Sequence, residues 1–421
     1  MFPPIAGGGI QRPLKFVKYL PDYGIEPIVF CPEKALWRAN IHEKEEYPFL
    51  NKTTIYRSGI KRLERYFNLR FKKGITQHPH FYILALKYLW YMDFQSAWYF
   101  ECRKEALKIA REEEVDCVFT TSPPHSTHLF GLYLKKKAGI PWIMDIRDAM
   151  YDDPNVERTI GVRLKSAIRY LYEKKFYSLS DAIVSVSDPI IDSINQRHKR
   201  LNLESKTHTI TNGFDEEDFE NIQLDNRGRR SLVITYTGSF MGRQTPEHFL
   251  EAINLLIDKN AVDASDLLIR FIGYFYKRTH AIFQRFISKI PIEILDFQPY
   301  EKSLWYQVNS DLLLLIVSIE GGEGGNQTMT GKFFEYIGSK RPIFALAPEG
   351  PLKQIILNGR FGRVAPPKDI EKIAEGFKVY YKEWKKKGNL EYQPDKNIRK
   401  KFMRKALTEK LALIISKTLS I

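Results

Sequence analysis

Residues 312–346 read LLLLIVSIEGGEGGNQTMTGKFFEYIGSKRPIFAL. An apolar run of strand length at 312–317 leads into a glycine-dense loop, a helix-sized segment and a second apolar run at 342–346. This order of strand, loop, helix and strand is typical of parallel sheets that carry helices on both faces. The stretch therefore predicts an α/β fold.

The end of the loop, Thr330-Gly331-Lys332, is suited to an anionic ligand. Backbone N–H groups are exposed where such a loop enters a helix, and Lys332 adds a positive charge. Glu335, about one turn further, suits the two vicinal hydroxyls of a ribose; the alternative is an ordinary first-turn glutamate favoured by the helix dipole. The segment is not a P-loop, because Phe333 stands where that motif requires Ser or Thr.

The same alternation runs along nearly the whole chain. Further strands are predicted at 26–31, 53–57, 116–121, 142–146, 182–187, 208–211, 232–237, 268–273 and 292–297. A length of 421 residues is about twice what one hydrophobic core supports, so we expect two similar α/β halves. The predicted organisation is a domain at 1–213, a linker at 214–230, a second domain at 231–395 and a C-terminal helix at 396–421 that crosses back to the first domain or stays apart.

The amino-acid composition excludes a disordered chain and favours a globular protein with anionic partners. With 43% hydrophobic and 13% aromatic residues the chain is too apolar to be disordered. A net charge of +15 favours anionic partners such as phosphates, nucleic acid or an acidic membrane face. Three scattered cysteines give neither a disulfide framework nor a metal site, which makes a reducing cytoplasm the default.

Membrane contact is expected to be peripheral, because the apolar runs are shorter than the roughly 20 residues that a bilayer requires. Residues 57–99 combine basic and aromatic side chains, as a segment lying on an anionic membrane at the inner face of the cell would. The alternative is a solvated helix face.

Three further motifs lie where ligands of an α/β sheet bind, beyond the carboxyl ends of strands. Gly8 and Gly9 precede a helical stretch and let an anion approach backbone N–H groups, or form a plain flexible loop. His125, in a strand-to-helix junction, is suited to proton transfer, or it caps the helix. Arg147 follows the next strand and contacts substrate or pairs with Asp145.

In the second half, Gly238 ends a predicted strand and Arg243 follows five residues later. Arg243 suits a bidentate phosphate contact, with a surface arginine as the alternative.

These segments, in this order, resemble GT-B retaining glycosyltransferases of the family 4 type, which includes many bacterial cell-surface polysaccharide enzymes. The resemblance spans the chain and rests on FPPIAGGG (2–9), SPPHSTHL (122–129), GIPWIMDIRD (139–148), TNGFD (211–215), GKFFEYI (331–337) and RPI (341–343). It implies two Rossmann-like domains that face a central cleft, with a glycan or lipid-linked acceptor on the first and a nucleotide-sugar donor on the second.

The resemblance also implies residue roles. His125 lies near the reacting sugar, Arg243 and Lys332 neutralise the diphosphate, and Glu335 holds the ribose. Gly8 and Gly9 approach the donor phosphates, and the remaining substrate-binding candidates are Arg147, Gly238, Thr330 and Gly331. Transfer would retain configuration and need no cofactor and no metal, and nucleic acid is not an expected partner.

Two departures from the family leave alternatives open. Gln327 stands where the family often has the first acid of E-x7-E, so a catalytically inactive scaffold that binds a glycan or a protein remains an alternative, and a basic nucleic-acid-binding protein is a weaker one. Family members also begin with an apolar strand, whereas this chain starts inside the first loop. We therefore expect an N-terminally incomplete chain whose first domain lacks a central strand.

Overall fold

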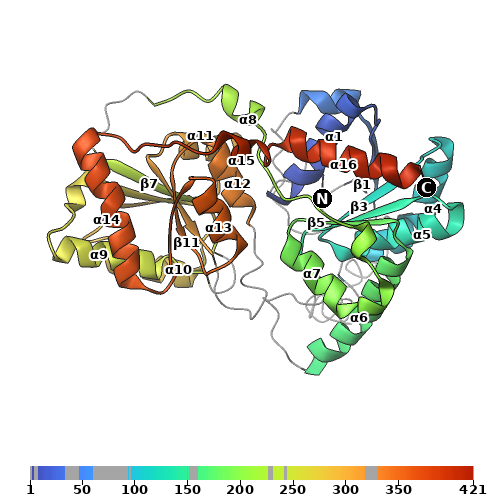
Figure 1. The fold of residues 1–421 in the computed structure, drawn as a ribbon, viewed down its shortest axis with the longest axis horizontal. Coiled ribbons are helices and arrows are strands. Elements are labelled where there is room, and N and C mark those ends of the chain that lie inside the picture. The colour runs from blue at the N-terminus through green and yellow to red at the C-terminus, as the bar shows by residue number, and fades with distance from the viewer. Residues whose placement is uncertain are drawn as a thin grey trace, which may run out of the picture. The chain divides into compact units, whose positions relative to one another are not determined.

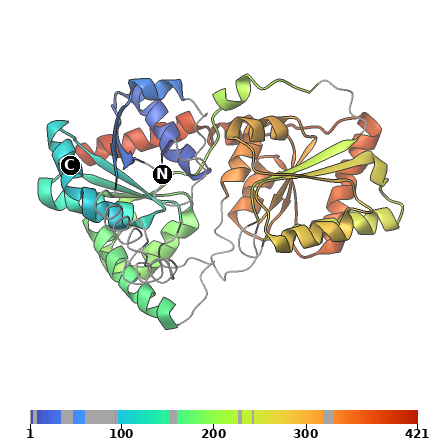
Figure 2. The same ribbon diagram turned by 180° about the vertical axis from the view of Figure 1, so that it is seen from behind.

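The computed structural model describes residues 2–3, 8–33, 47–59, 93, 96–148, 150, 160–225, 231–240, 244–317 and 330–420, with backbone only for 160–167. The chain divides into two compact units (Figures 1 and 2). The first comprises Met1–Thr211 and Leu407–Ile421, and the second comprises Asn212–Ala406.

The first unit is an α/β structure with two separate parallel sheets, β1-β2 and β3-β4-β5-β6. Its strands are β1 (Ile28–Pro32), β2 (Thr54–Ser58), β3 (Val118–Ser122), β4 (Trp142–Ile146), β5 (Ala182–Ser185) and β6 (Thr207–Thr209). Its helices in the described ranges are α1 (Gln11–Tyr19), α4 (Ser96–Glu112), α5 (His128–Ala138), α6 (Ile160–Leu179), α7 (Asp188–Arg197) and most of α16 (Arg404–Leu419). That the chain is N-terminally incomplete stays a prediction.

The second unit has one parallel six-stranded sheet in the order β12-β11-β10-β7-β8-β9. Its strands are β7 (Leu232–Thr237), β8 (Leu267–Ile272), β9 (Ile292–Leu295), β10 (Leu312–Ile316), β11 (Ile343–Leu346) and β12 (Gly362–Ala365). Its helices in the described ranges are α8 (Glu217–Glu220), α9 (Glu247–Asp258), α10 (Lys277–Phe286), α11 (Tyr300–Val308), α12 (Gly331–Gly338), α13 (Pro351–Asn358), α14 (Ile370–Lys387) and α15 (Lys396–Lys400).

Successive residues of a strand point to opposite faces of a sheet, and both faces are covered by helices in each unit. In β10, Leu314 packs with α9, α10 and α14, whereas Leu315 packs with α12 and α13. In β4, Trp142 packs with α5, α6 and α7, whereas Ile143 packs with α1 and α16, which lie side by side in Figure 1. The predicted α/β fold with doubly wound parallel sheets is confirmed.

The segment predicted as a linker belongs in part to the second unit. Phe214 is only 1% exposed, its N–H donates to the Phe402 carbonyl at 3.0 Å, and its carbonyl accepts from Arg404 N–H at 2.8 Å. Phe214 therefore belongs to the core of the second unit, and the partly buried Phe219 packs against the same cluster, whereas Leu224 is exposed. The chain leaves the first unit after Thr211, whereas the sequence predicts the end of the first domain at 213. It returns to the first unit after Ala406, whereas the sequence predicts the end of the second domain at 395.

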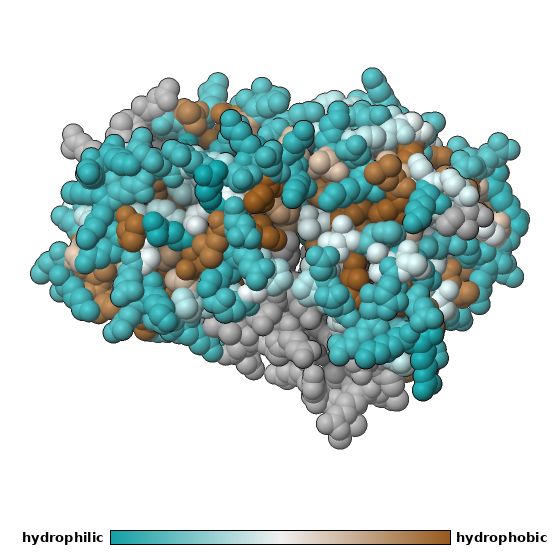
Figure 3. Space-filling view, viewed as in Figure 1, coloured by the Kyte–Doolittle hydropathy of each residue, from teal (hydrophilic) through white to brown (hydrophobic). Residues whose placement is uncertain are grey.

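The surface in Figure 3 is mainly hydrophilic, with apolar side chains in small separate groups. No described helix is both long enough and apolar enough to cross a bilayer. Most of residues 57–99 lie outside the described residues, so contact of this segment with an anionic membrane stays a prediction.

Gly131 provides a test of the packing in the first unit. A Cβ at Gly131 in α5 would lie 2.0 Å from Nε1 of the fully buried Trp142. Alanine is favoured over glycine in a helix by about 1 kcal/mol, but overpacking costs about 1–3 kcal/mol and should dominate. We expect Gly131→Ala to lower the thermal midpoint of the first unit by a few degrees, measured by calorimetry. The exposed Lys136→Ala in the same helix is the control, and an unchanged midpoint for Gly131→Ala would contradict the packing described.

Candidate functional site

The main candidate site lies in the second unit, where the end of β7 meets the beginning of α12. The Thr237 N–H donates to the Tyr336 hydroxyl at 2.9 Å, which ties this strand end to the helix. Thr330 precedes the helix in an extended conformation, and its buried Oγ1 has no hydrogen-bond partner among the described residues. A helix N-terminus with a neighbouring hydroxyl is a natural place for an anion.

Lys332 extends from the first turn of α12 across Gly238. Its Nζ donates to the Tyr236 hydroxyl at 2.6 Å and to the Ser239 carbonyl at 3.3 Å, and lies 4.3 Å from the centroid of the Tyr236 ring. Gly238 has φ of 102°, and a Cβ there would lie 2.4 Å from Lys332 Cε. Glycine is therefore required at 238 for both conformation and space.

Burial lowers the pKa of the Lys332 ammonium to about 8, although attraction to Glu335 acts in the opposite direction. The ammonium has lost water and has gained only a hydroxyl, a carbonyl and a ring face in return. An anion placed beside it would therefore be strongly attracted.

Glu335 lies one turn further along α12. Burial raises the pKa of its carboxyl to about 7, while a hydrogen bond from Gln307 acts against this rise. Gln307 is fully buried, and its Nε2 lies 3.5 Å from Glu335 Oε2 and 3.3 Å from Thr237 Oγ1. Its Oε1 has no hydrogen-bond partner among the described residues. The carboxyl is held in place but poorly solvated, as expected of a group that meets a ligand.

The structure thus brings Gly238, Lys332 and Glu335 together beside Thr330 and Gly331. Arg243 and Gln327 lie outside the described residues. Sequence reasoning missed Tyr236 and Gln307. Tyr236 stands one residue before the predicted end of its strand, so its position was a usable signal, whereas nothing in the helix that carries Gln307 points to a contact with Glu335.

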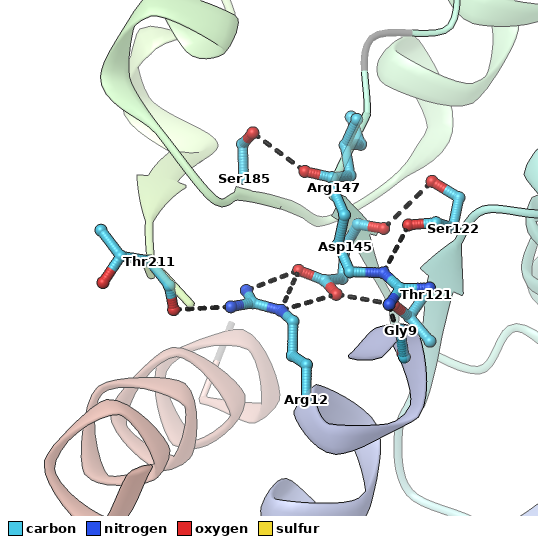
Figure 4. A network of polar contacts seen from close by, with 9 residues as sticks. Gly9, Arg12, Thr121, Ser122, Asp145, Arg147, Ser185 and Thr211 are labelled. Carbon is cyan, nitrogen blue, oxygen red and sulfur yellow. Dashed lines mark hydrogen bonds and ion pairs between the residues drawn. The ribbon is translucent and has the colours of Figure 1, made fainter. Parts of the chain in front are cut away.

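A second group of candidate residues lies in the first unit (Figure 4). Arg147 follows β4 and donates to three backbone carbonyls: from Nε to Ser122 at 2.7 Å, from Nη2 to Pro123 at 3.0 Å, and from Nη1 to Gly9. Gly9 lies in the 3₁₀ turn Gly8–Ile10 before α1, which is called the glycine turn, and the half-buried His125 begins the turn His125–Thr127 before α5, which is called the histidine turn. Arg147 therefore connects the glycine turn to the end of β3 and to the residue after it, which lead into the histidine turn.

The hydrogen-bonded partner of Asp145 is Arg12, and not Arg147 as one sequence alternative had it. Arg12 is 1% exposed and Asp145 is fully buried; Nη2 of Arg12 lies 2.7 Å from Oδ1, and Nε lies 3.0 Å from Oδ2. Thr121 donates to Asp145 Oδ2 at 2.7 Å, and Arg12 Nη1 donates to the Thr211 carbonyl at 2.7 Å. Both buried charges are thus satisfied, which a stable buried ion pair requires.

His128 is a structural residue. Trp142 Nε1 donates to Thr120 Oγ1 at 2.8 Å, and the Thr120 hydroxyl is hydrogen-bonded to His128 Nδ1 at 2.9 Å. Complete burial holds the pKa of His128 well below its usual value, so the ring stays neutral. Of the two histidines in this motif, only His125 is partly exposed.

Solved structures share the arrangement of both units. A sucrose-phosphate synthase from Thermosynechococcus elongatus is 13% identical, with a TM-score of 0.64 over 99% of this chain and 94% of that one. The chain has the GT-B fold. The Anabaena protein HepE, solved in complex with UDP and glucose, is 11% identical, with a TM-score of 0.57 over 93% of this chain and 99% of HepE.

An α,α-trehalose 6-phosphate synthase from Burkholderia multivorans is also 11% identical, with a TM-score of 0.51 over 76% of this chain and 77% of its own. No family model and no curated protein matches the sequence. At such identities the likeness shows the fold alone.

The raised pKa of Glu335 predicts a pH-dependent cost to the second unit. A carboxyl whose folded pKa exceeds its unfolded value contributes stability that is present below the unfolded value of 4.5 and lost as the pH rises through about 7. Glutamine carries no ionisable proton, so the free energy of unfolding of Glu335→Gln relative to wild type should rise by about 1–3 kcal/mol as the pH increases from about 5 to 8. Urea unfolding across this range measures it, with the exposed Glu375→Gln of α14 as control. A difference from wild type that does not vary with pH would show that Glu335 is ordinarily solvated.

Proposed function

We propose that the chain is a glycosyltransferase that moves a sugar from a nucleoside diphosphate donor to a glycan or lipid-linked acceptor. The observation that carries the proposal is the placement of the Lys332 ammonium over Gly238, one helical turn from the Glu335 carboxyl. One cation at a helix N-terminus with one carboxylate nearby matches a ligand that joins a diphosphate to a ribose.

In this proposal the diphosphate takes the place of the Tyr236 hydroxyl as partner of Lys332, and the N–H groups at the start of α12 bind its oxygens. Glu335 accepts hydrogen bonds from the ribose hydroxyls, which favour the ionised carboxylate and lower its pKa. Arg243 adds a second positive charge to the diphosphate. The GT-B fold and the UDP found with HepE support a nucleotide as the ligand.

The bond between the anomeric carbon and the diphosphate oxygen breaks as the acceptor hydroxyl attacks the same face of the sugar, so that configuration is retained. Negative charge develops on the departing diphosphate, where Lys332 and the helix N–H groups stabilise it. Lys332 and Arg243 supply the positive charge at the diphosphate that a metal ion supplies in other enzymes. His125 of the first unit acts near the reacting sugar, and a role in surface polysaccharide synthesis at an anionic membrane accounts for the basic segment at 57–99.

Binding of UDP, GDP, ADP and TDP by calorimetry, followed by slow hydrolysis of the matching nucleotide-sugars, tests the proposal. Lys332 carries its proton below about pH 8, so affinity for the bound nucleotide should fall as the pH rises past this value. Loss of one charge-assisted hydrogen bond in Lys332→Met should weaken binding about 10–100-fold at pH 7 and remove the step in affinity. The exposed Lys386→Met of α14 is the control. Equal affinity in Lys332→Met and wild type would rule out this phosphate site.

A separate prediction concerns His125. Since proton transfer by a positioned side chain contributes about 10²–10⁴-fold, His125→Ala should lower turnover by that factor. Nucleotide affinity should stay within about twofold, because His125 belongs to the first unit, whereas Lys332 and Glu335, which hold the nucleotide in this proposal, belong to the second. The exposed His280→Ala serves as control. A His125→Ala variant with most of its turnover would show that this histidine only supports its turn.

A further inference from the structure

Arg147 makes contacts that are unusual for a residue expected to bind substrate. Its guanidinium donates to the carbonyls of Gly9, in the glycine turn, and of Ser122 and Pro123, which lead from β3 into the histidine turn. The Arg147 N–H also donates to the Ser122 carbonyl, at 3.3 Å. The N–H groups of the Arg147 guanidinium are thus hydrogen-bonded to backbone carbonyls of the protein.

The histidine turn, residues 125–127, is closed by the Thr127 N–H, which donates to the Pro124 carbonyl at 3.3 Å. The two residues before it, Pro123 and Pro124, have no N–H, so the segment that enters the turn has few donors of its own. Arg147 supplies donors to that segment, at the carbonyls of Ser122 and Pro123.

The glycine turn depends on the same side chain. In a trans peptide the C=O and the following N–H point in opposite directions, so holding the Gly9 carbonyl also fixes the direction of the next N–H. The base of Arg147 is itself fixed, because the Ser185 hydroxyl donates to the Ile146 carbonyl at 2.9 Å and the Arg12–Asp145 pair lies beneath it in Figure 4.

We propose that Arg147 is a positioning residue that sets the glycine turn and the His125 turn in one fixed arrangement. The proposal rests on the proposed transferase function, in which His125 acts on the reacting sugar. In this proposal Arg147 acts by holding three backbone carbonyls in place, and its charge does not contact the substrate. Such a role requires the planar, forked donors of a guanidinium, which a lysine ammonium does not reproduce.

Arg147→Lys and Arg147→Gln distinguish the two roles, because lysine keeps the charge and glutamine does not. If Arg147 positions the turns, both variants should lose turnover by about 10²-fold, since small displacements of reacting groups have effects of this size. Their affinity for UDP should fall much less than their turnover, because Lys332 and Glu335 lie in the second unit. Hydrogen exchange of peptides covering 8–20 and 118–130 should become faster in both variants and unchanged elsewhere. Arg111→Lys, an exposed arginine of α4, is the matched control.

Retention of turnover by Arg147→Lys, with loss only in Arg147→Gln, would overturn the proposal in favour of a charge contact with substrate. Unchanged exchange at both turns would overturn it as well. The exchange measurement needs no substrate and therefore tests the positioning role even if the wild-type chain binds none of the four nucleotides. That failure would count against the proposed function alone. Thermal midpoints identify any variant that fails to fold, in which case the milder Arg147→Lys decides the outcome.

Discussion

Every described strand pairs with its neighbour in parallel, and this constraint determines where chemistry can occur. Parallel neighbours bring their carboxyl ends to the same sheet edge and need a crossover connection on one face. The loops that carry Gly238, His125 and Arg147 all follow strands. Within one sheet, residues far apart in sequence meet at this edge, as Arg147 meets Ser122 and Pro123 after the neighbouring strands β4 and β3 of the first unit.

The two candidate sites differ in how well the fold compensates their buried charges. In the first unit the buried Arg12–Asp145 pair is surrounded by hydrogen bonds, so its charges are stabilised without any ligand. In the second unit the pKa of Lys332 is lowered and that of Glu335 is raised, in both cases mainly by burial. A charged group that the fold leaves poorly compensated gains most from a ligand of opposite charge or matching hydrogen bonds. The Arg12 pair is therefore fully compensated within the fold, whereas Lys332 is not.

Sequence patterns revealed elements whose signal is local. The segments 232–237 and 312–317 became fully buried strands because near-continuous apolar and β-branched residues suit a parallel sheet covered on both faces. The strand Gly362–Ala365 escaped prediction because it is short, lies at the sheet edge and carries a glycine and an arginine. An edge strand has one hydrogen-bonded neighbour and needs less apolar surface than a central one.

The candidate site follows the same rule, in that its local part could be predicted from the sequence and its long-range part could not. Thr330-Gly331-Lys332 could be predicted, because a lysine after a glycine-dense loop is a local pattern. Arg12 and Gln307 are long-range partners, 133 and 28 residues from the carboxylates that they contact. Their importance comes from burial beside a charge, and burial is set by packing that a single sequence does not encode locally.

The pairing of Lys332 with Gly238 explains why an ammonium suits this position. An ammonium is a compact point charge with three donors, and two of the Lys332 contacts are to the Tyr236 hydroxyl and the Ser239 carbonyl. The flexible stem crosses Gly238, where a Cβ would lie 2.4 Å from Lys332 Cε. An arginine would bring a wider, planar group to the same place. The glycine at 238 and the lysine at 332 therefore depend on each other, because the first leaves the space that the stem of the second occupies.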